Sequence, residues 1–282
     1  MIKIISPGIL TSIQDLGRVG HAHFGVPTSG AMDKQSHQLA NAILNNEKNA
    51  ATLEITYGNV KFEFLQACEI CITGANFSPE INGNTIALNK RVAVNRGAVF
   101  TLGKRVYGLR TYLAIQGGIN SETIFGSRSF YKGVTTKSNI KKGDIIEVFN
   151  PSKRTSSNNY SRFKVDLEHF NSPVIECFQG PEFDLLTDEQ HKKLLNTQFT
   201  ISPKNNRMGY MLTEKIENQL PSILSSGVLP GTVQLTPSGE LIVLMRDCQV
   251  TGGYPRVLQL TESAINRLAQ KTTGEKVIIN LI

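Results

Sequence analysis

Short runs of apolar and β-branched residues, separated by turn-forming residues, make up most of the chain. In the first half the runs expected to form strands are 2–5, 60–64, 68–73, 92–94, 99–102, 111–115 and 145–149. Asn82-Gly83 is a strong hairpin signal between two of them. The second half repeats the pattern, with expected strands at 174–178, 199–201, 233–235, 241–245, 257–260 and 277–282. Strands spaced this closely predict a mainly β protein built from barrels or sandwiches.

A few segments switch to helical spacing. Between residues 32 and 44 the apolar positions fall on one helical stripe, and either Ser29 or Asp33 can cap its start. Thr187 opens a capping box, T-D-E-Q, before a short helix that ends near residue 195. Thr261 can cap a third helix near the end of the chain. We therefore expect a few short helices among the strands.

A polar stretch between residues 150 and 171 divides the two β-rich halves. Such a composition is typical of a boundary between domains. We expect an N-terminal domain over 1–152, a polar linker over 153–171 and a C-terminal domain over 172–282. The two halves contain similar elements, which indicates a duplicated architecture with weak residue identity.

The stretch from Leu244 to Pro255 is the strongest candidate for a site. Asp247, Gln249 and Thr251 are two residues apart, so in an extended segment their side chains would share one face. Gly252 and Gly253 then let the backbone turn or approach a ligand, and Tyr254-Pro255 stiffens the segment that follows. A strand end with a solvated polar face is the alternative interpretation of these residues alone.

Three arginines, Arg18, Arg128 and Arg207, occur in turns rich in glycine or small polar residues. A guanidinium group held by a turn is a good bidentate ligand for a carboxylate or a phosphate. Exposed arginines in turns are also common, but three in one chain favour a binding function. Asp15 and Asp33 lie near the first of these turns in the sequence.

Net charge, histidine content and glycine motifs limit the kinds of ligand that the sequence predicts. The 282-residue chain has a formal charge of +7, but its basic residues are scattered, which disfavours nucleic-acid binding. The excess fits a small anionic substrate or a solvated surface.

His21 and His23 lack further ligands at metal-like spacing, so no metal site is expected. Residues 97–104 miss the spacing of a phosphate-binding loop, and a dinucleotide fingerprint is absent.

The four cysteines do not indicate a disulfide-rich secreted protein. Cys68 and Cys71 have C-x-x-C spacing, but on a strand an offset of three places the thiols on opposite faces, so both are expected to pack. Cys248 is expected to pack in the core or in a wall of the site rather than to act as a nucleophile. The sequence has neither a signal-peptide pattern nor an apolar run long enough to span a membrane, which predicts a cytoplasmic protein.

Ordered motifs along the chain resemble one known family. They include P-G-x-x-T-S-I-Q-D-L-G-R-x-G, G-V-P-x-S-G-A-M-D, A-T-L-E, I-T-G-A, Y-L-A-I-Q-G-G, F-G-S-R-S, N-R-M-G-Y, P-G-T-V-Q-L and D-C-Q-V-T-G-G-Y-P. Together they resemble the family of 5-oxoprolinase C subunits, also described as allophanate hydrolase subunit 2 or biotin-dependent carboxyltransferase, from about Ile2 to Ile282. The resemblance implies two cyclophilin-like β-barrel domains with the site between them or along their shared face.

The same resemblance implies a function. Some members act with A-subunit-like and B-subunit-like partners in an ATP-dependent 5-oxoprolinase, which opens the lactam of 5-oxoproline to give L-glutamate. Others are the carboxyltransferase part of a biotin-dependent urea carboxylase, and a regulatory role as antagonist of a kinase inhibitor is also attached to the family. None of the five methionines adjoins a lysine, so this chain has no biotinylation motif. The 5-oxoprolinase function, with ATP used through the complex, is the leading expectation, and biotin belongs to the alternative.

Site residues follow from the matching motifs. The candidates for catalysis are Asp247, Asp33, Asp15 and Gln249. The candidates for binding the substrate or a phosphate group are Arg18, Gln14, Arg128, Arg207, Gln234, Thr251, Gly252, Gly253 and Tyr254. The family's usual D-R-Q-T-T-G-G-Y-P is changed at Cys248 and Val250, and Arg246 is a candidate to replace the lost arginine.

Overall fold

The computed structural model describes residues 1–149 and 166–282. Its strands and short helices confirm the mainly β fold class. Of the linker expected over 153–171, residues 153–165 lie outside the described residues and residues 166–171 lie within them. Two compact units are formed: unit 1 comprises Met1–Gly17 and Asp33–Asn171, and unit 2 comprises Arg18–Met32 and Ser172–Ile282. Nothing in the sequence pattern predicts that residues 18–32 pack with the second unit.

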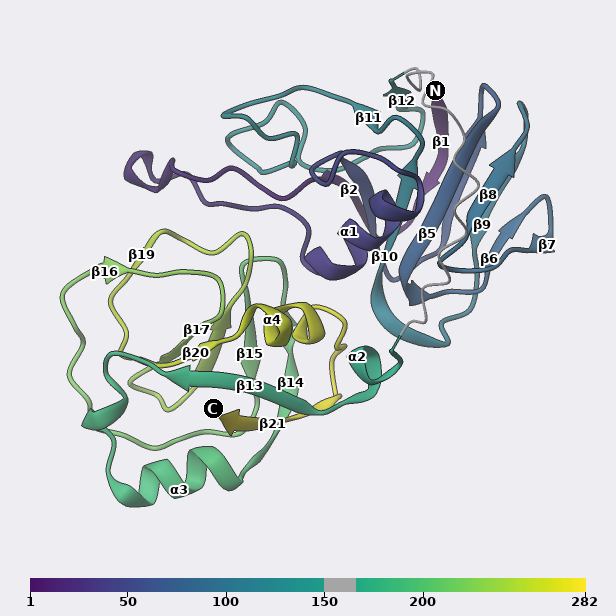
Figure 1. Ribbon diagram of the computed structural model, residues 1–282. Coiled ribbons are helices and arrows are strands. Elements are labelled where there is room, and N and C mark those ends of the chain that lie inside the picture. Colours follow the sequence, from purple (N-terminus) through teal and green to yellow (C-terminus); the bar gives the residue numbers. More distant parts are fainter. Residues whose placement is uncertain (150–165) are drawn as a thin grey trace. The chain divides into compact units, whose positions relative to one another are not determined.

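Unit 1 contains two antiparallel sheets (Figure 1). The seven-stranded sheet has the order β11 (Ile119–Asn120), β12 (Ile145–Val148), β1 (Ile2–Pro7), β4 (Val60–Phe64), β9 (Val99–Leu102), β6 (Pro79–Ile81) and β7 (Asn84–Thr85). The five-stranded sheet has the order β2 (Leu10–Gln14), β3 (Thr52–Thr56), β10 (Tyr107–Ile115), β5 (Cys68–Asn76) and β8 (Arg91–Val94). The predicted hairpin at Asn82-Gly83 is confirmed, because it joins β6 to β7 and both residues have positive φ.

The five-stranded sheet has two chemically different faces. One face contributes Ile13, Leu53, Ile72 and Leu113 to an apolar core shared with residues of the seven-stranded sheet. Helix α1 (Lys34–Ile43) packs against β5 and β10, where Ala40 and Leu44 meet Cys71 and Ala114. Cys68 and Cys71 therefore pack in different clusters, and all four cysteines are free, as their spacing predicts.

Unit 2 is built on a closed barrel (Figure 1). The strand order is β13 (Val174–Gln179), β20 (Arg256–Leu260), β17 (Thr232–Leu235), β18 (Leu241–Leu244), β15 (Gly209–Leu212), β14 (Gln198–Asn205) and β21 (Lys276–Leu281). Only β13 and β21 pair in parallel among these described strands. The barrel encloses an apolar core that includes Met32 from the 18–32 segment. Strands β16 (Ser226–Gly227) and β19 (Thr251–Gly252) form a separate pair.

Helix boundaries agree with the capping signals. Asp33 caps α1 by accepting a hydrogen bond from the Ser36 N–H at 3.0 Å. Thr187 forms the predicted capping box at α3 (Asp188–Asn196), and Thr261 caps α4 (Glu262–Leu268). The remaining helical segments are η1 (Ala22–Phe24), α2 (Glu168–Asn171) and η2 (Phe183–Leu185). Helix α2 lies within the range expected to be linker.

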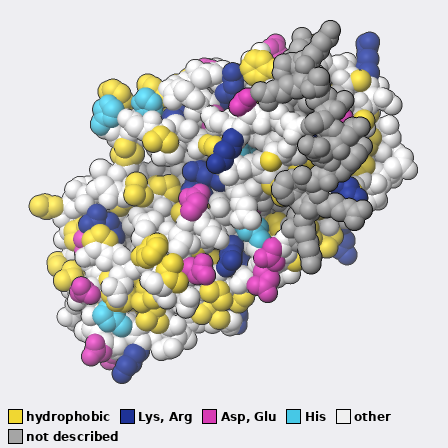
Figure 2. Space-filling view, viewed as in Figure 1, with side chains coloured by type: hydrophobic (Ala, Val, Ile, Leu, Met, Phe, Trp, Pro, Cys, Tyr) yellow, Lys and Arg dark blue, Asp and Glu magenta, His cyan; other side chains and the backbone are white. Residues whose placement is uncertain are grey.

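On the face of the molecule seen in Figure 2, basic and acidic side chains are interspersed. No single patch of either sign covers the part of this face where side chains are coloured. Among the described residues, no helix is long and apolar enough to cross a membrane.

Candidate active site

Buried polar side chains cover part of one face of the five-stranded sheet in unit 1. We call this set the polar sheet face; its members are Ser12, Gln14, Thr52, Glu54, Thr56, Thr73, Arg110 and Tyr112, each at most 8% exposed. Strand register places Ser12 opposite Glu54, Glu54 opposite Tyr112, and Tyr112 opposite Thr73. One row of polar side chains therefore crosses four neighbouring strands. Buried polar groups at this density are costly unless hydrogen-bonded, so their bonding partners are informative.

Tyr112 connects this face to the start of helix α1. Its hydroxyl donates to Glu54 Oε2 at 2.8 Å and accepts from the Asp33 N–H at 2.8 Å. Burial and the nearby carboxylates of Glu54 and Asp33 raise the pKa of Tyr112 well above its usual value. The phenol thus keeps its proton and remains a hydrogen-bond donor. Arg110 Nε lies 3.8 Å from Glu54 Oε1, which brings a positive charge to the same carboxylate.

Two histidines border the same network. His169 in α2 contacts Asp33, with Nε2 2.9 Å from Oδ2. His37 in α1 lies with Nδ1 2.9 Å from Thr52 Oγ1. Burial lowers the pKa of His37 to about 4, although neighbouring carboxylates oppose the shift. His37 is therefore neutral at pH 7.

Asp15 organises a loop of unit 1. Its Oδ1 accepts from Ser127 Oγ at 2.7 Å, Ser129 Oγ at 2.6 Å and the Gly17 N–H at 2.7 Å, and its Oδ2 accepts from the Arg128 N–H at 2.6 Å. A carboxylate offers about four acceptor positions, and four donors contact this one, three of them at Oδ1. The structure brings the predicted residues Asp15 and Arg128 together, but through the arginine backbone.

The Arg128 guanidinium is engaged elsewhere. It donates to the Ser121 carbonyl and lies 5.1 Å from the centre of the Phe149 ring. Gln14 adjoins Asp15 in sequence and belongs to the polar sheet face. Its amide nitrogen donates to Ser12 Oγ at 3.0 Å and to the Phe130 carbonyl at 3.3 Å.

Gln14 presents a buried acceptor. The Phe130 carbonyl can only accept, so the NH₂ group of Gln14 must face it. This orientation leaves Oε1 of Gln14 shielded from solvent and without a hydrogen-bond partner among the described residues. An unsatisfied buried acceptor costs about 1–3 kcal/mol, and a hydrogen bond from a ligand N–H to Oε1 would recover this free energy.

In unit 2, Asp247 and Arg207 form a buried ion pair. Arg207 Nε donates to Asp247 Oδ2 at 2.7 Å, and Nη2 of the same guanidinium group donates to Oδ1 at 2.9 Å. Ser29 Oγ donates to Asp247 Oδ1 at 2.6 Å, and the Gly30 carbonyl accepts from Arg207 at 2.7 Å. Ser29 has φ of 56°, a conformation that is rare outside glycine. The pair thus fixes the 18–32 segment on the barrel of unit 2.

The predicted alternation of Asp247, Gln249 and Thr251 is wrong. Asp247 lies in a turn that begins at Met245, whose carbonyl accepts from the Cys248 N–H at 3.0 Å. Asp247 is buried, whereas Gln249 and Thr251 are exposed. The extended segment assumed from the sequence stops at Leu244, so the two-residue period does not continue into the polar residues.

Arg246, the candidate to replace the lost family arginine, is engaged by side chains of α4. Its guanidinium donates to both carboxylate oxygens of Glu262 in α4, at 3.0 and 2.6 Å, and to Asn266 Oδ1 at 3.0 Å. Cys248 is buried beside Val228 and Leu244 in a small apolar cluster. Burial raises the pKa of its thiol to about 12, so it is not a nucleophile at neutral pH.

Gly252 and Gln234 pack directly against each other. A Cβ atom at Gly252 would lie 2.4 Å from Gln234 Nε2, so the Gln234 side chain would have to shift. Gln234 Nε2 lies 3.5 Å from the Tyr254 carbonyl, and the Gly253 carbonyl accepts from the Ile223 N–H. Gly252 and Tyr254, two of the predicted residues, thus meet Gln234. Arg18, another predicted binding residue, is also buried, at 1% exposed.

Glu54, Tyr112, Arg110, His37 and His169 were not singled out from the sequence. The alternation of Thr52, Glu54 and Thr56 with apolar residues was the available signal for a strand with one polar face. Among the described residues, no group of three or more His, Cys, Asp or Glu side chains could hold a metal ion.

Comparison with models of protein families shows which family the chain belongs to. The model of the carboxyltransferase domain, subdomains A and B, matches residues 24–280. The chain belongs to this carboxyltransferase-domain family. Within it, the chain is 33% identical over 283 residues to a protein of Escherichia coli K12 named as the C subunit of 5-oxoprolinase, covering 98% of this chain and 90% of that protein.

Other relatives in the family are much longer. A urea amidolyase of Lachancea kluyveri is 38% identical over 160 residues, which is 55% of this chain but 9% of that protein. The solved urea amidolyase of K. lactis superposes with a TM-score of 0.86 and 26% identity, covering 99% of this chain and 18% of that one. The carboxyltransferase-domain fold is therefore shared by the whole chain.

Proposed function

We propose that this chain is the C subunit of an ATP-dependent 5-oxoprolinase complex that opens the lactam of 5-oxoproline to give L-glutamate. The observation that carries the proposal is the similarity to the E. coli 5-oxoprolinase C subunit, which extends over 98% of this chain and 90% of that protein. The match thus involves one protein of comparable length rather than a domain of a longer enzyme. The proposal includes an A-subunit-like and a B-subunit-like partner, turnover only in the complex, and a cytoplasmic location.

Gln14 is the proposed ligand of the lactam amide. Its Oε1 is buried without a partner among the described residues, and the lactam N–H of 5-oxoproline is a donor of the required kind. A site built around an unsatisfied acceptor discriminates strongly against molecules that lack the matching N–H. Arg18 stays a candidate for the substrate carboxylate, because a guanidinium group is a good bidentate ligand for a carboxylate.

The three candidate aspartates are better suited to positioning than to proton transfer. Asp15 accepts four hydrogen bonds, and Asp247 accepts two from Arg207 and one from Ser29. Asp33 caps α1 and contacts His169. A proton acceptor needs a free lone pair that faces the reacting group. We propose that these carboxylates hold the loops and the helix start that shape the site.

The nucleotide is proposed to bind a partner protein of the complex. Residues 99–102 of the loop-like sequence form strand β9, and the guanidinium groups of Arg128 and Arg207 are engaged by protein groups. Neither this segment nor these two guanidinium groups is therefore suited to cradle a phosphate group. In the complex ATP would supply phosphorylation of the lactam carbonyl oxygen, which turns a poor electrophile into a reactive one.

The test is to co-purify this chain with its A-subunit-like and B-subunit-like partners and measure ADP release and glutamate formation from 5-oxoproline. Gln14→Met should raise KM for 5-oxoproline by about tenfold or more, since a missing polar contact in a buried site costs at least that much. Gln35→Met, at an exposed position of α1, is the matched control. Turnover absent from the complete complex would contradict the proposal, and an unchanged KM in Gln14→Met would remove Gln14 from it.

A carboxyltransferase role for urea or a related amide is the second candidate. It is favoured by the 38% identity to the Lachancea urea amidolyase over 160 residues and by the K. lactis superposition. Biotin would have to be presented by a partner, because the chain lacks a Met-Lys pair for its attachment. Carboxylation of urea by the complex, with no glutamate formed from 5-oxoproline, would favour this function.

A further inference from the structure

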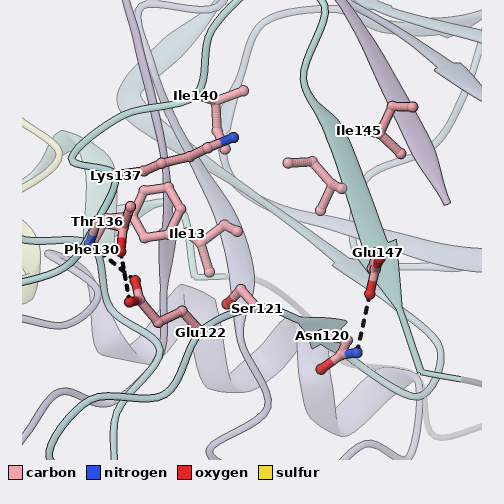
Figure 3. Close-up of a pocket in the computed structure, with 11 residues that line it drawn as sticks. Ile13, Asn120, Ser121, Glu122, Phe130, Thr136, Lys137, Ile140, Ile145 and Glu147 are labelled. Atoms are coloured by element: carbon pink, nitrogen blue, oxygen red, sulfur yellow. Dashed lines mark hydrogen bonds between the residues drawn. The ribbon is translucent and has the colours of Figure 1, made fainter.

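A cavity of about 370 Å³ opens in unit 1, away from the polar sheet face (Figure 3). Residues of β2, β11 and β12 line it, together with residues from the loops between β11 and β12. Ile13 projects into the cavity from the apolar face of the five-stranded sheet, opposite to Ser12 and Gln14. The cavity is thus distinct from the site considered above, and its volume is within the range of small-ligand pockets.

The floor of this cavity is apolar. Ile13, Phe130 and Ile140 line it and belong to the core of unit 1, each at most 6% exposed. Ile145 lines the wall and is 55% exposed, which is unusual for a large aliphatic side chain on a strand. Ile146, 5% exposed, lines the cavity and belongs to the same core, so a ligand with a branched apolar body would contact this floor and gain from its burial.

The rim has an excess of negative charge. Glu122, Glu147 and Lys137 lie on it (Figure 3). Lys137 Nζ is already 2.9 Å from Asp144 Oδ1, so its charge is compensated. Burial alone would raise the pKa of Asp144, but hydrogen bonds from Lys137 and from the Lys141 N–H hold it below the usual value. The rim thus carries Glu122 and Glu147 besides the Lys137–Asp144 pair, and the Arg128 guanidinium adjoins it by donating to the Ser121 carbonyl.

Both glutamates retain acceptor capacity. Glu122 accepts one hydrogen bond at each oxygen, from the N–H and the hydroxyl of Thr136, and a carboxylate oxygen can accept two. Glu147 Oε2 accepts from Asn120 at 3.3 Å. A ligand with several N–H donors would bond to these oxygens without displacing the protein donors.

Ser121 supplies an independent sign of a ligand. Its hydroxyl oxygen is shielded from solvent and has no hydrogen-bond partner among the described residues, although Ser121 lines the cavity. In Figure 3 it is drawn between Glu122 and the Asn120–Glu147 pair. Leaving a buried hydroxyl unpaired costs free energy that a ligand N–H would recover.

We propose that this cavity binds a small apolar primary amine, with the ammonium group at the glutamate rim and the apolar body on the isoleucine floor. An ammonium group offers three N–H donors and a charge opposite to that of Glu122 and Glu147. A carboxylate of the same shape would meet Glu122 and Glu147 and be repelled. The site is separate from the proposed lactam chemistry, so it can be tested on this chain whatever that chemistry proves to be.

The experiment compares two probes of equal branching, 3-methylbutylamine and 3-methylbutanoate, by two-dimensional NMR of the 15N-labelled full chain. The amine should shift the amide signals of Ser121, Glu122 and Glu147 in a saturable manner, and the carboxylate should not. Glu147→Gln should weaken the amine at least about fivefold, as expected for loss of a charge-assisted bond, and Ser121→Ala should weaken it by a smaller factor. Glu80→Gln, on strand β6, is the matched control and should leave the affinity unchanged.

Three outcomes would overturn the proposal. The first is the absence of saturable shifts at the cavity with either probe. The second is binding of 3-methylbutanoate as tight as that of the amine. The third is equal affinity of Glu147→Gln and Glu80→Gln for the amine. Wild-type-like spectra of both variants without ligand establish that a lost affinity does not come from misfolding.

Discussion

Asp247→Asn tests whether Asp247 is a structural anchor. The substitution keeps the shape of the side chain but leaves the Arg207 guanidinium without its negative partner in a place where both side chains are 10% exposed. Asp247 accepts bonds at 2.7, 2.9 and 2.6 Å from Arg207 and Ser29, and an amide replaces one of these acceptors by a donor. Breaking one side of a buried, hydrogen-bonded ion pair costs about 3–5 kcal/mol.

The assay is urea denaturation followed by circular dichroism, since the chain has no tryptophan for fluorescence. Lys215→Met is the control in the same unit, because Lys215 is 53% exposed and its 4.0 Å contact with Glu240 should contribute at most about 1 kcal/mol. The double variant Arg207→Met/Asp247→Leu should be less destabilised than Asp247→Asn, since it leaves no uncompensated charge. A loss of less than about 1 kcal/mol in Asp247→Asn would refute the anchor role and restore Asp247 as a catalytic candidate.

Three further predictions concern stability. Asp15→Asn leaves a buried donor unpaired and should lower the free energy of unfolding by about 1–3 kcal/mol, as measured by urea denaturation. Burial lowers the pKa of His37 to about 4, so near pH 6.5 only the unfolded chain takes up a proton at this residue. The contribution of His37 to the free energy of unfolding should therefore be fully present above pH 6.5 and fall by about 3 kcal/mol as the pH drops to 4. His37→Gln should flatten this dependence, and an unchanged slope would contradict the assignment. Gly252→Ala should destabilise unit 2 by about 1–3 kcal/mol because its Cβ would meet Gln234, whereas Gly253→Ala, with its nearest neighbour at 3.5 Å, should have little effect.

Much of the fold could be predicted from local sequence signals. The strand at 60–64, the hairpin at Asn82-Gly83 and the caps at Asp33, Thr187 and Thr261 all depend on residues close in sequence. Strands β2 and β3 were missed because their polar residues look like loop or surface positions until the buried sheet face is known. Helix α2 was missed because it follows a long polar stretch.

The candidate site was less predictable for a physical reason. Arg207 pairs with Asp247 across 40 residues, and Ser29 reaches the same carboxylate across 218 residues. Such pairings depend on how strands are ordered, and residue spacing carries no information about them. The motif that contains Glu54 could be recognised, but its hydrogen bond to Tyr112 could not. The alternation at Asp247 failed because a turn interrupts the strand one residue before Arg246.

Substrate competition in the complete complex tests the central claim most directly. The chain, purified with its A-subunit-like and B-subunit-like partners, is given ATP with 5-oxoproline in one reaction and ATP with urea, bicarbonate and a biotinylated partner in another. The proposed function predicts ADP and L-glutamate in equal amounts from 5-oxoproline and no carboxylated urea. Carboxylated urea as the product, with 5-oxoproline left unchanged, would contradict it.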